Sequence, residues 1–158
     1  MGTSSKIEIV ETEDVRVAAL QHRGPPANIG ETIRKFIGWR KATGLSPKIS
    51  ATYNVFYDDI HNTPPEAFRL DLCASTDRPI AANEVGVVEK IIPGGRCATF
   101  RYTGSDDGFD PALTALYRDW LPQSGAELRD FPLYCRRVSF FPDVPEHEAL
   151  TEFFLPLR

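Results

Sequence analysis

Residue patterns typical of nucleic-acid binding and of common catalytic sites are missing from this chain of 158 residues. It carries 18 Lys and Arg against 22 Asp and Glu, which gives a net charge of −4. The longest basic runs are only two residues long, among them Arg40-Lys41 and Arg136-Arg137. Because a protein that binds phosphate backbones needs clustered Lys and Arg, we expect no direct binding to nucleic acid. No GxSxG, HExxH, Walker A or GxGxxG motif is present, so the sequence predicts no catalytic residues and no cofactor.

Long apolar runs are missing as well. No run approaches the ~20 residues that a membrane-spanning helix needs. Residues 1–15 are polar and acidic, unlike the apolar core of a signal peptide. The sequence therefore favours a cytoplasmic protein with no membrane partner.

Cysteine and histidine are scarce, with three of each. The cysteines are odd in number and form no CxxC pair: Cys73, Cys97 and Cys135. We expect buried free thiols in a reducing cytosol, and a catalytic cysteine is the alternative. The histidines are His22, His61 and His147. Because none has a second histidine at the spacing of a metal site, the sequence predicts no metal site.

What the chain does contain is an internal duplication. Residues 16–24 and 96–104 share one alternation of side chains at an offset of 80, and each segment runs from an arginine to a glycine. The spacing from that glycine is 15 residues to Trp39 and 16 residues to Trp120. Another glycine lies five residues after each tryptophan, at the position expected just past a helix end. A repeat of this length predicts two copies of one structural unit.

Each copy is predicted to fold as β-α-β-β, because strand-like alternation and helical spacing recur in the same order. The fold class is therefore α+β: two tandem β-α-β-β repeats with pseudo-twofold symmetry, and an antiparallel sheet with helices packed on one face. We expect a single domain, 1–158, with one half at about 6–76, a connector at 77–95 and the other half at about 96–158. Four large side chains are expected to hold the helices to the sheet: Phe36, Trp39, Leu116 and Trp120.

Two features bear on ligand binding. Aromatic residues are dense, and three of them, Tyr53, Phe56 and Tyr57, share one predicted strand. Such a surface suits flat, cationic or hydrophobic molecules through stacking and cation–π contacts. The last strand of each copy also carries an acid, Asp71 or Glu152. That carboxylate either faces solvent or points into a cavity where a cation must compensate it, and the pattern leaves both open.

Several segments, taken together, resemble a known family. They are NVFYDD at 54–59, TPPE at 63–66, FRLD at 68–71, PGGR at 93–96, LYRDWLPQSG at 116–125, PDVPEHE at 142–148 and TEFFLPL at 151–157. In this order and spacing they are similar to the DNA gyrase inhibitor-like (GyrI-like) small-molecule-binding domain. The same effector-binding domain occurs at the C-terminus of AraC-type and MerR-type transcription regulators. The resemblance covers nearly all of residues 8–158.

The resemblance implies two β-α-β-β repeats with a ligand cleft between them, which in bacterial regulators holds hydrophobic and cationic drugs. We therefore expect a stand-alone protein that senses or sequesters a hydrophobic or aromatic compound. One alternative is a hydrolase that detoxifies a reactive genotoxin in the same cleft, with Glu152 as general base and a tyrosine assisting. Another is a protein–protein inhibitor of DNA gyrase. The chain shows no helix-turn-helix pattern, so we expect it to be no regulator itself, and its candidate protein partners are gyrase or a regulator.

The resemblance also implies a set of ligand-binding residues. They are Tyr57, Tyr102, Tyr134 and Glu152, with Tyr53 and Phe56 near the wall of the cleft. Period-2 alternation of side chains means that not all of them can point inward. The sequence departs from the family where many members carry a ligand-facing Glu, because Cys135 stands there, followed by Arg136 and Arg137. A positive side chain in the cleft would favour an anion instead of a cation.

Overall fold

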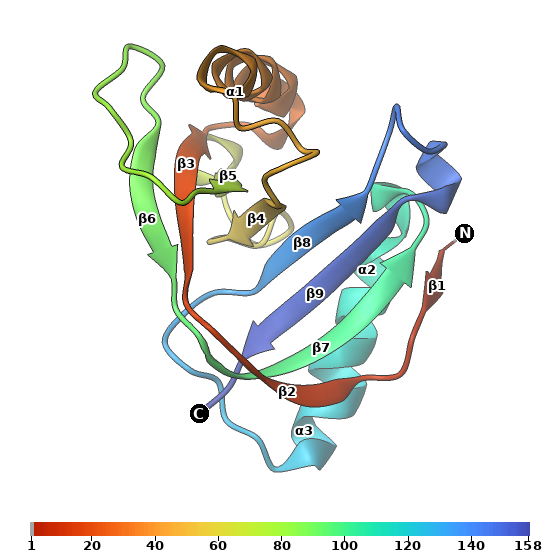
Figure 1. Cartoon of the computed structure of the whole chain (residues 1–158). Helices are drawn as coiled ribbons and strands as arrows, with labels where there is room; N and C mark the ends of the chain where they lie inside the picture. The colour runs from red at the N-terminus through yellow and green to blue at the C-terminus, as the bar shows by residue number, and fades with distance from the viewer. Residues whose placement is uncertain (1) are drawn as a thin grey trace. The chain divides into compact units, whose positions relative to one another are not determined.

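The computed structural model describes residues 2–158, which form two compact units (Figure 1). One unit comprises residues 14–93, and the other comprises residues 2–13 together with 94–158. We call them the 14–93 unit and the 94–158 unit. Each is an antiparallel sheet with a helix on one face, so the predicted α+β fold class is confirmed.

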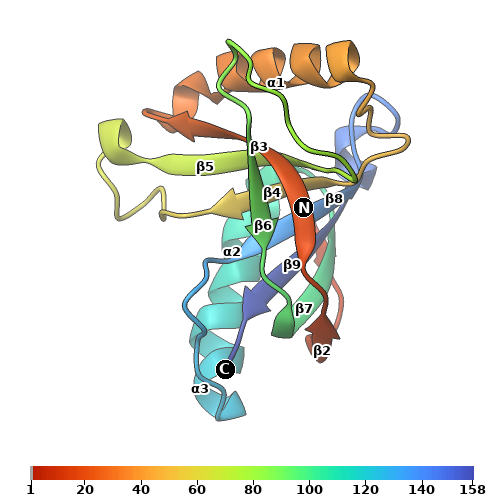
Figure 2. The same cartoon turned by 60° about the vertical axis from the view of Figure 1, so that its left-hand side comes forward.

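The 14–93 unit contains four strands and one long helix. Its elements are β3 (Val15–Arg23), a 3-10 turn (Pro26–Asn28), α1 (Ile29–Thr43), β4 (Thr52–Phe56), a second 3-10 turn (Pro65–Ala67), β5 (Arg69–Ser75) and β6 (Val88–Ile92). The strand order is β4-β5-β3-β6, and every pairing is antiparallel. Figure 2 shows α1 running over one face of this sheet.

The 94–158 unit repeats this plan with a broken helix. Its elements are β1 (Thr3–Ser4), β2 (Glu8–Thr12), β7 (Gly95–Thr103), a 3-10 turn (Asp106–Gly108), α2 (Phe109–Thr114), a π-helix (Ala115–Trp120), α3 (Leu121–Ser124), β8 (Tyr134–Ser139), a 3-10 turn (Glu146–Glu148) and β9 (Leu150–Pro156). The strand order is β2-β7-β9-β8, and β1 also pairs with β7.

The duplication extends to the pairing of individual residues. In β3 and β5, Gln21 lies opposite Asp71; in β7 and β9, Arg101 lies opposite Glu152. Asp71 and Glu152 therefore hold equivalent positions. In the neighbouring ladders, Tyr53 lies opposite Cys73 and Tyr134 lies opposite Phe154. Tyr53 and Tyr134 are equivalent in the same way.

The π-helix accounts for the one-residue difference in tryptophan spacing. The helical segment 109–124 is one residue longer than α1. A π-turn fits one extra residue into a helix while the later turns keep their register. Both helical segments accordingly end on a left-handed glycine, Gly44 with φ 76° and Gly125 with φ 73°. Both glycines lie where the sequence predicted the helix ends.

The cores of the two units differ around the tryptophans. Trp39 is buried, stacks on Phe36 at 5.9 Å between ring centroids, and belongs to a cluster with Leu45 and Phe68. Leu116 is also buried, but Trp120 is only half-buried, so its predicted core position is wrong. The reason lies in its surroundings. The positions equivalent to Leu45 and Phe68 carry only alanines, Ala126 and Ala149.

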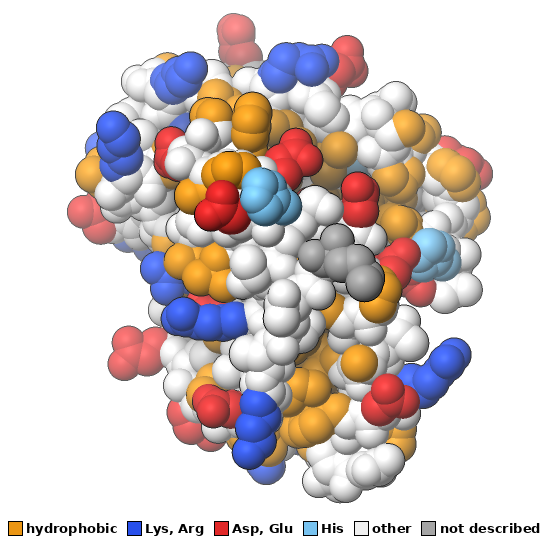
Figure 3. Space-filling model, turned by 90° about the vertical axis from the view of Figure 1, so that its right-hand side faces the viewer, with side chains coloured by type: hydrophobic (Ala, Val, Ile, Leu, Met, Phe, Trp, Pro, Cys, Tyr) orange, Lys and Arg blue, Asp and Glu red, His pale blue; other side chains and the backbone are white. Residues whose placement is uncertain are grey.

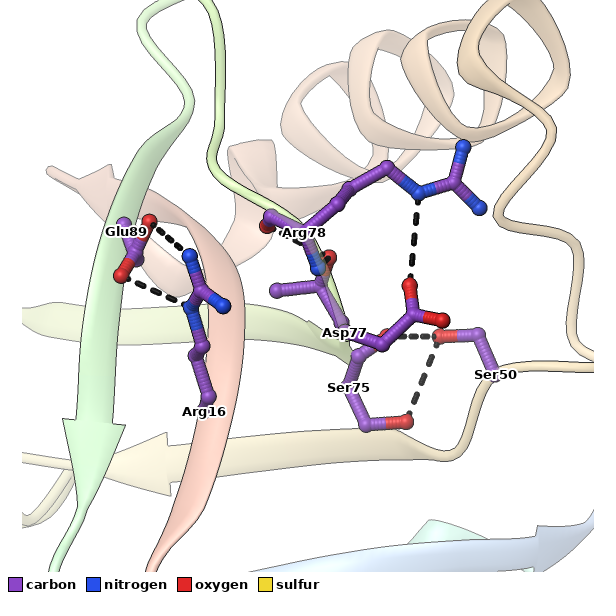
Figure 4. Close-up of polar contacts among 7 residues, drawn as sticks. Arg16, Ser50, Ser75, Asp77, Arg78 and Glu89 are labelled. Atoms are coloured by element: carbon purple, nitrogen blue, oxygen red, sulfur yellow. Dashed lines mark hydrogen bonds and ion pairs between the residues drawn. The ribbon is translucent and has the colours of Figure 1, made fainter.

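The edge strands are exchanged between the two sequence copies. Strand β2 precedes β3 in the chain yet pairs with β7, whereas β6 precedes β7 and pairs with β3. The Arg16 guanidinium on β3 donates two hydrogen bonds to the Glu89 carboxylate on β6, at 2.8 and 3.1 Å (Figure 4). The compact units therefore follow strand pairing, and they differ from the expected sequence halves at residues 6–13 and 77–93.

Candidate ligand-binding site

Each sheet has one face covered by its helix and one face that the helix of that unit leaves free. In the 14–93 unit the covered face packs Leu20, Leu72 and Phe56 against Phe36 and Trp39. Because side chains alternate along a strand, the neighbours of these strand residues lie on the opposite, helix-free face. That face holds Tyr53 and Tyr57 from the β4 segment, Gln21 from β3, Asp71 from β5 and Lys90 from β6.

Asp71 is the centre of a polar network on this face. Its side chain is 1% exposed. Oδ2 accepts hydrogen bonds from the Tyr57 hydroxyl at 2.9 Å and from Lys90 Nζ at 2.7 Å, and Oδ1 accepts one from Gln21 Nε2 at 3.2 Å. Burial, and then the hydrogen bond to Asp71, raise the pKa of Tyr57 well above its ordinary value. Tyr57 therefore stays protonated and acts as a hydrogen-bond donor.

Two cations flank the Tyr57 ring. Lys90 Nζ and the Arg69 guanidinium carbon each lie 5.5 Å from its centroid. Arg69 also holds Asp58 through two hydrogen bonds, at 2.9 and 3.1 Å, and this contact lowers the pKa of Asp58. Cation–π contacts to this ring are thus already made by side chains of the same unit.

The helix-free face of the 94–158 unit carries the second carboxylate. Arg101 Nε donates to Glu152 Oε2 at 3.3 Å, and Arg136 lies opposite Glu152 in the β8–β9 pairing. Beside them Tyr134 stacks on Phe154, with ring centroids 5.0 Å apart and planes 12° from parallel. The face therefore combines a stacked aromatic pair with a carboxylate whose charge a cation balances.

Thr99 adds an unsatisfied polar group to this face. It pairs opposite Phe154 and shares the strand face of Arg101. Its hydroxyl oxygen is shielded from solvent and has no hydrogen-bond partner among residues 2–158. Buried hydroxyls of folded proteins nearly always have a partner. The Thr99 hydroxyl is thus an unsatisfied polar group buried on this face.

Two of the six predicted site residues lie on helix-covered faces instead. Phe56 packs into the core with α1. Tyr102 is buried, meets Phe109 of α2 edge-on at 5.3 Å, and donates its hydroxyl hydrogen to the Ser105 carbonyl at 3.0 Å. The equivalent residue in the other unit is His22, whose Nε2 lies 3.0 Å from the Pro25 carbonyl. In both units this residue therefore anchors the turn that leads into the helix.

A family model described as the GyrI-like small-molecule-binding domain matches residues 5–158. The chain belongs to this family. The probable transcriptional regulator YgiV of Escherichia coli K12 is 38% identical over 152 residues, which cover 96% of this chain and 95% of that protein. A DNA gyrase inhibitor of Erwinia billingiae is 24% identical over 131 residues, 81% of this chain and 83% of that protein.

Solved structures show the same fold. The EcmrR C-terminal domain superposes with a TM-score of 0.77 at 15% identity, covering 97% of each chain. SAV2435 bound to tetraphenylphosphonium superposes with a TM-score of 0.59 at 7% identity, covering 98% of this chain and 94% of the other. The EcmrR C-terminal domain and SAV2435 thus share the fold of this chain.

The position where this GyrI-like chain departs from the family pattern lies on a helix-covered face. Cys135 is buried opposite Phe153, which packs on Phe109 of α2. Arg137 shares this side, binds Asp106 at 2.7 and 3.0 Å, and lies over the Phe109 ring at 5.1 Å. Arg137 therefore holds the turn before α2, whereas Arg101 and Arg136 lie on the helix-free face.

A surface depression of about 440 Å³ lies elsewhere in the 94–158 unit. Its walls are Ile7, Ala115, Asp119, Trp120, Gln123 and Ser124. It contains none of the predicted site residues, and we do not assign the ligand to it. The residues from 2 to 158 hold no group of three or more metal-ligating side chains, and no helix among them is long and apolar enough to cross a membrane. On the face drawn in Figure 3, Lys and Arg side chains are interspersed with Asp and Glu side chains.

Proposed function

We propose that this GyrI-like domain senses or sequesters a hydrophobic or aromatic small molecule on the helix-free faces of its sheets. The observation that carries the proposal is the shared placement of Tyr53, Tyr57 and Tyr134 with both strand carboxylates on those faces. Aromatic rings supply large contact area at little cost in conformational entropy, and the polar groups beside them fix orientation. The cleft between the halves, implied by the family resemblance, stays a prediction, as does a cytoplasmic location.

The charges on these faces favour a neutral aromatic ligand. SAV2435 was solved with tetraphenylphosphonium, a lipophilic cation. In this chain, however, Lys90 balances Asp71, and Arg101 balances Glu152. An organic cation would therefore have to compete with a side chain for either carboxylate. A neutral aromatic ring avoids that competition.

The hydrolase and gyrase-inhibitor alternatives stay predictions. Glu152 is held by Arg101, and no described contact joins it to a tyrosine. The gyrase-inhibitor alternative has the name of the Erwinia relative behind it. We favour small-molecule binding because the tyrosines and carboxylates that it would use lie on the helix-free faces of the sheets.

The test is a titration of the purified protein with three probes of one shape and different charge. They are 2-naphthol, naphthalene-2-sulfonate and 2-naphthylmethylammonium, and calorimetry measures their binding. We expect 2-naphthol to bind and the ammonium probe to bind more weakly. Tyr53→Leu should weaken 2-naphthol binding by roughly 5–10-fold, because it removes a stacking surface.

Phe56→Leu is the matched control, since it removes a ring from the other face of the same strand. It should lower stability by about 1 kcal/mol and leave the dissociation constant for 2-naphthol unchanged. Equal losses of affinity in both variants, or no binding of any probe, would contradict the proposal.

A further inference from the structure

We propose that the Lys90 ammonium is a built-in occupant of a cation site formed by Asp71 and Tyr57, and that it excludes organic cations from this face. The inference rests on the proposed function, because it assigns the charge preference of the same face. Lys90 is thus a residue that determines specificity and does not itself need to contact the ligand.

The geometry is that of a bound ammonium ligand. Lys90 Nζ lies 2.7 Å from a carboxylate oxygen of Asp71 and 5.5 Å from the Tyr57 ring centroid. A carboxylate together with an aromatic ring is the combination that binds organic ammonium groups. Here the ammonium group belongs to the protein itself, because it is the end of a lysine side chain on β6.

The carboxylate is fixed, whereas the ammonium is replaceable. The Asp71 side chain is 1% exposed and is held by Tyr57 and Gln21 as well as by the lysine. The Lys90 side chain is 36% exposed, so part of it reaches solvent. A buried carboxylate requires a compensating cation. Removing the lysine side chain therefore leaves a fixed anionic site with an opening in place of the stem.

The lysine belongs to one unit and is not required by the fold. In the β6–β3 pairing Lys90 lies opposite Val17, and in the β2–β7 pairing Val10 lies opposite Cys97. Val17 and Cys97 are equivalent, so Val10 stands at the lysine position of the other unit. That unit balances Glu152 with Arg101 from a neighbouring strand instead. The tethered ammonium is a feature of the Asp71 site alone.

The experiment removes the Lys90 side chain and supplies a free ammonium compound in its place. Lys90→Ala removes three carbons and the nitrogen, which n-propylammonium replaces atom for atom. We expect Lys90→Ala to melt at a lower temperature than the wild type, and millimolar n-propylammonium chloride to raise its Tm along a saturable curve. Sodium chloride of equal ionic strength and n-propanol should give no such curve. The wild type and Lys90→Ala/Asp71→Asn should not respond to n-propylammonium.

A second readout uses the naphthyl probes. We expect Lys90→Ala to bind 2-naphthylmethylammonium at least about tenfold more tightly than the wild type, whereas Lys90→Arg, which keeps the charge, should show no gain. Lys90→Gln serves in place of Lys90→Ala if the latter does not fold. Wild-type binding of 2-naphthol without any gain for ammonium compounds in the variants overturns this inference alone. A gain for ammonium compounds when the wild type binds none of the naphthyl probes overturns the proposed function alone.

Discussion

At the scale of single residues, Asp71 and Glu152 show how neighbours set the role of an acid. Both occupy the same position in equivalent strands. Asp71 is buried with three donors, whereas the Glu152 side chain is 18% exposed beside Arg101. A buried ion pair is costly to break by removing one partner, and an exposed pair contributes little. We therefore expect removal of the compensating cation to cost more stability at Asp71 than at Glu152.

The two tryptophans provide a stability prediction at the same scale. Trp39→Ala should cost about 3–5 kcal/mol in the free energy of unfolding, because it empties a packed core position. Trp120→Ala should cost roughly 1–2 kcal/mol, since its ring is half-buried beside small neighbours. Urea denaturation of the two variants measures both values. A loss for Trp120→Ala as large as that for Trp39→Ala would contradict the difference in packing.

Single residues also show how much of the candidate site can be predicted from the sequence. Alternation indicates that Tyr53 and Tyr57 share one strand face and that Phe56 lies on the other, but it does not say which face the helix covers. The resemblance named Tyr102 as a ligand residue. Its role in the turn becomes visible only through its equivalence with His22, which depends on strand register. Lys90 lay in the expected connector, where no sequence signal linked it to Asp71.

At the scale of elements, the π-helix is the main difference between the two copies. The sequence contained its signal, since the glycine-to-tryptophan spacing is longer by one residue in the second copy. That spacing alone fits an extra loop residue equally well. The structure places the extra residue inside the helix, where residues before and after the π-turn keep their equivalents in α1.

Deletion of one helical residue tests this account. Arg118 is exposed and lies inside the π-helix between Leu116 and Trp120, and Lys35 is exposed in the middle of α1. Deleting Arg118 should convert the π-turn to regular α-helix while Leu116 and Trp120 keep their faces, at a cost of less than about 2 kcal/mol. Deleting Lys35 should turn Phe36 and Trp39 relative to the preceding turn and cost more than about 4 kcal/mol, or prevent folding. Thermal melts and far-UV circular dichroism distinguish the two, and equal losses would argue against an insertion absorbed by the π-turn.

At the scale of the whole molecule, the main feature is the exchange of edge strands, in which β2 pairs with β7 and β6 pairs with β3. The exchanged edge strands are β2 at Glu8–Thr12 and β6 at Val88–Ile92. Their partners were not predictable, because a short edge strand fits any exposed strand edge of suitable length. Equivalent strands β3 and β7 offer similar edges, and in this structure Arg16 of β3 pairs with Glu89 of β6.

Proline substitutions at equivalent edge positions test the exchange. Glu11 of β2 lies opposite Arg96 of β7, and Ile91 of β6 lies opposite Arg16 of β3. Proline disrupts a strand ladder because it removes a donor and fixes the backbone. We expect Glu11→Pro to speed amide hydrogen exchange in residues 95–103 by about tenfold or more and to leave residues 15–23 protected. Ile91→Pro should have the reverse effect. Loss of protection in the strand next along the chain from each substitution would instead indicate that β2 pairs with β3, and β6 with β7.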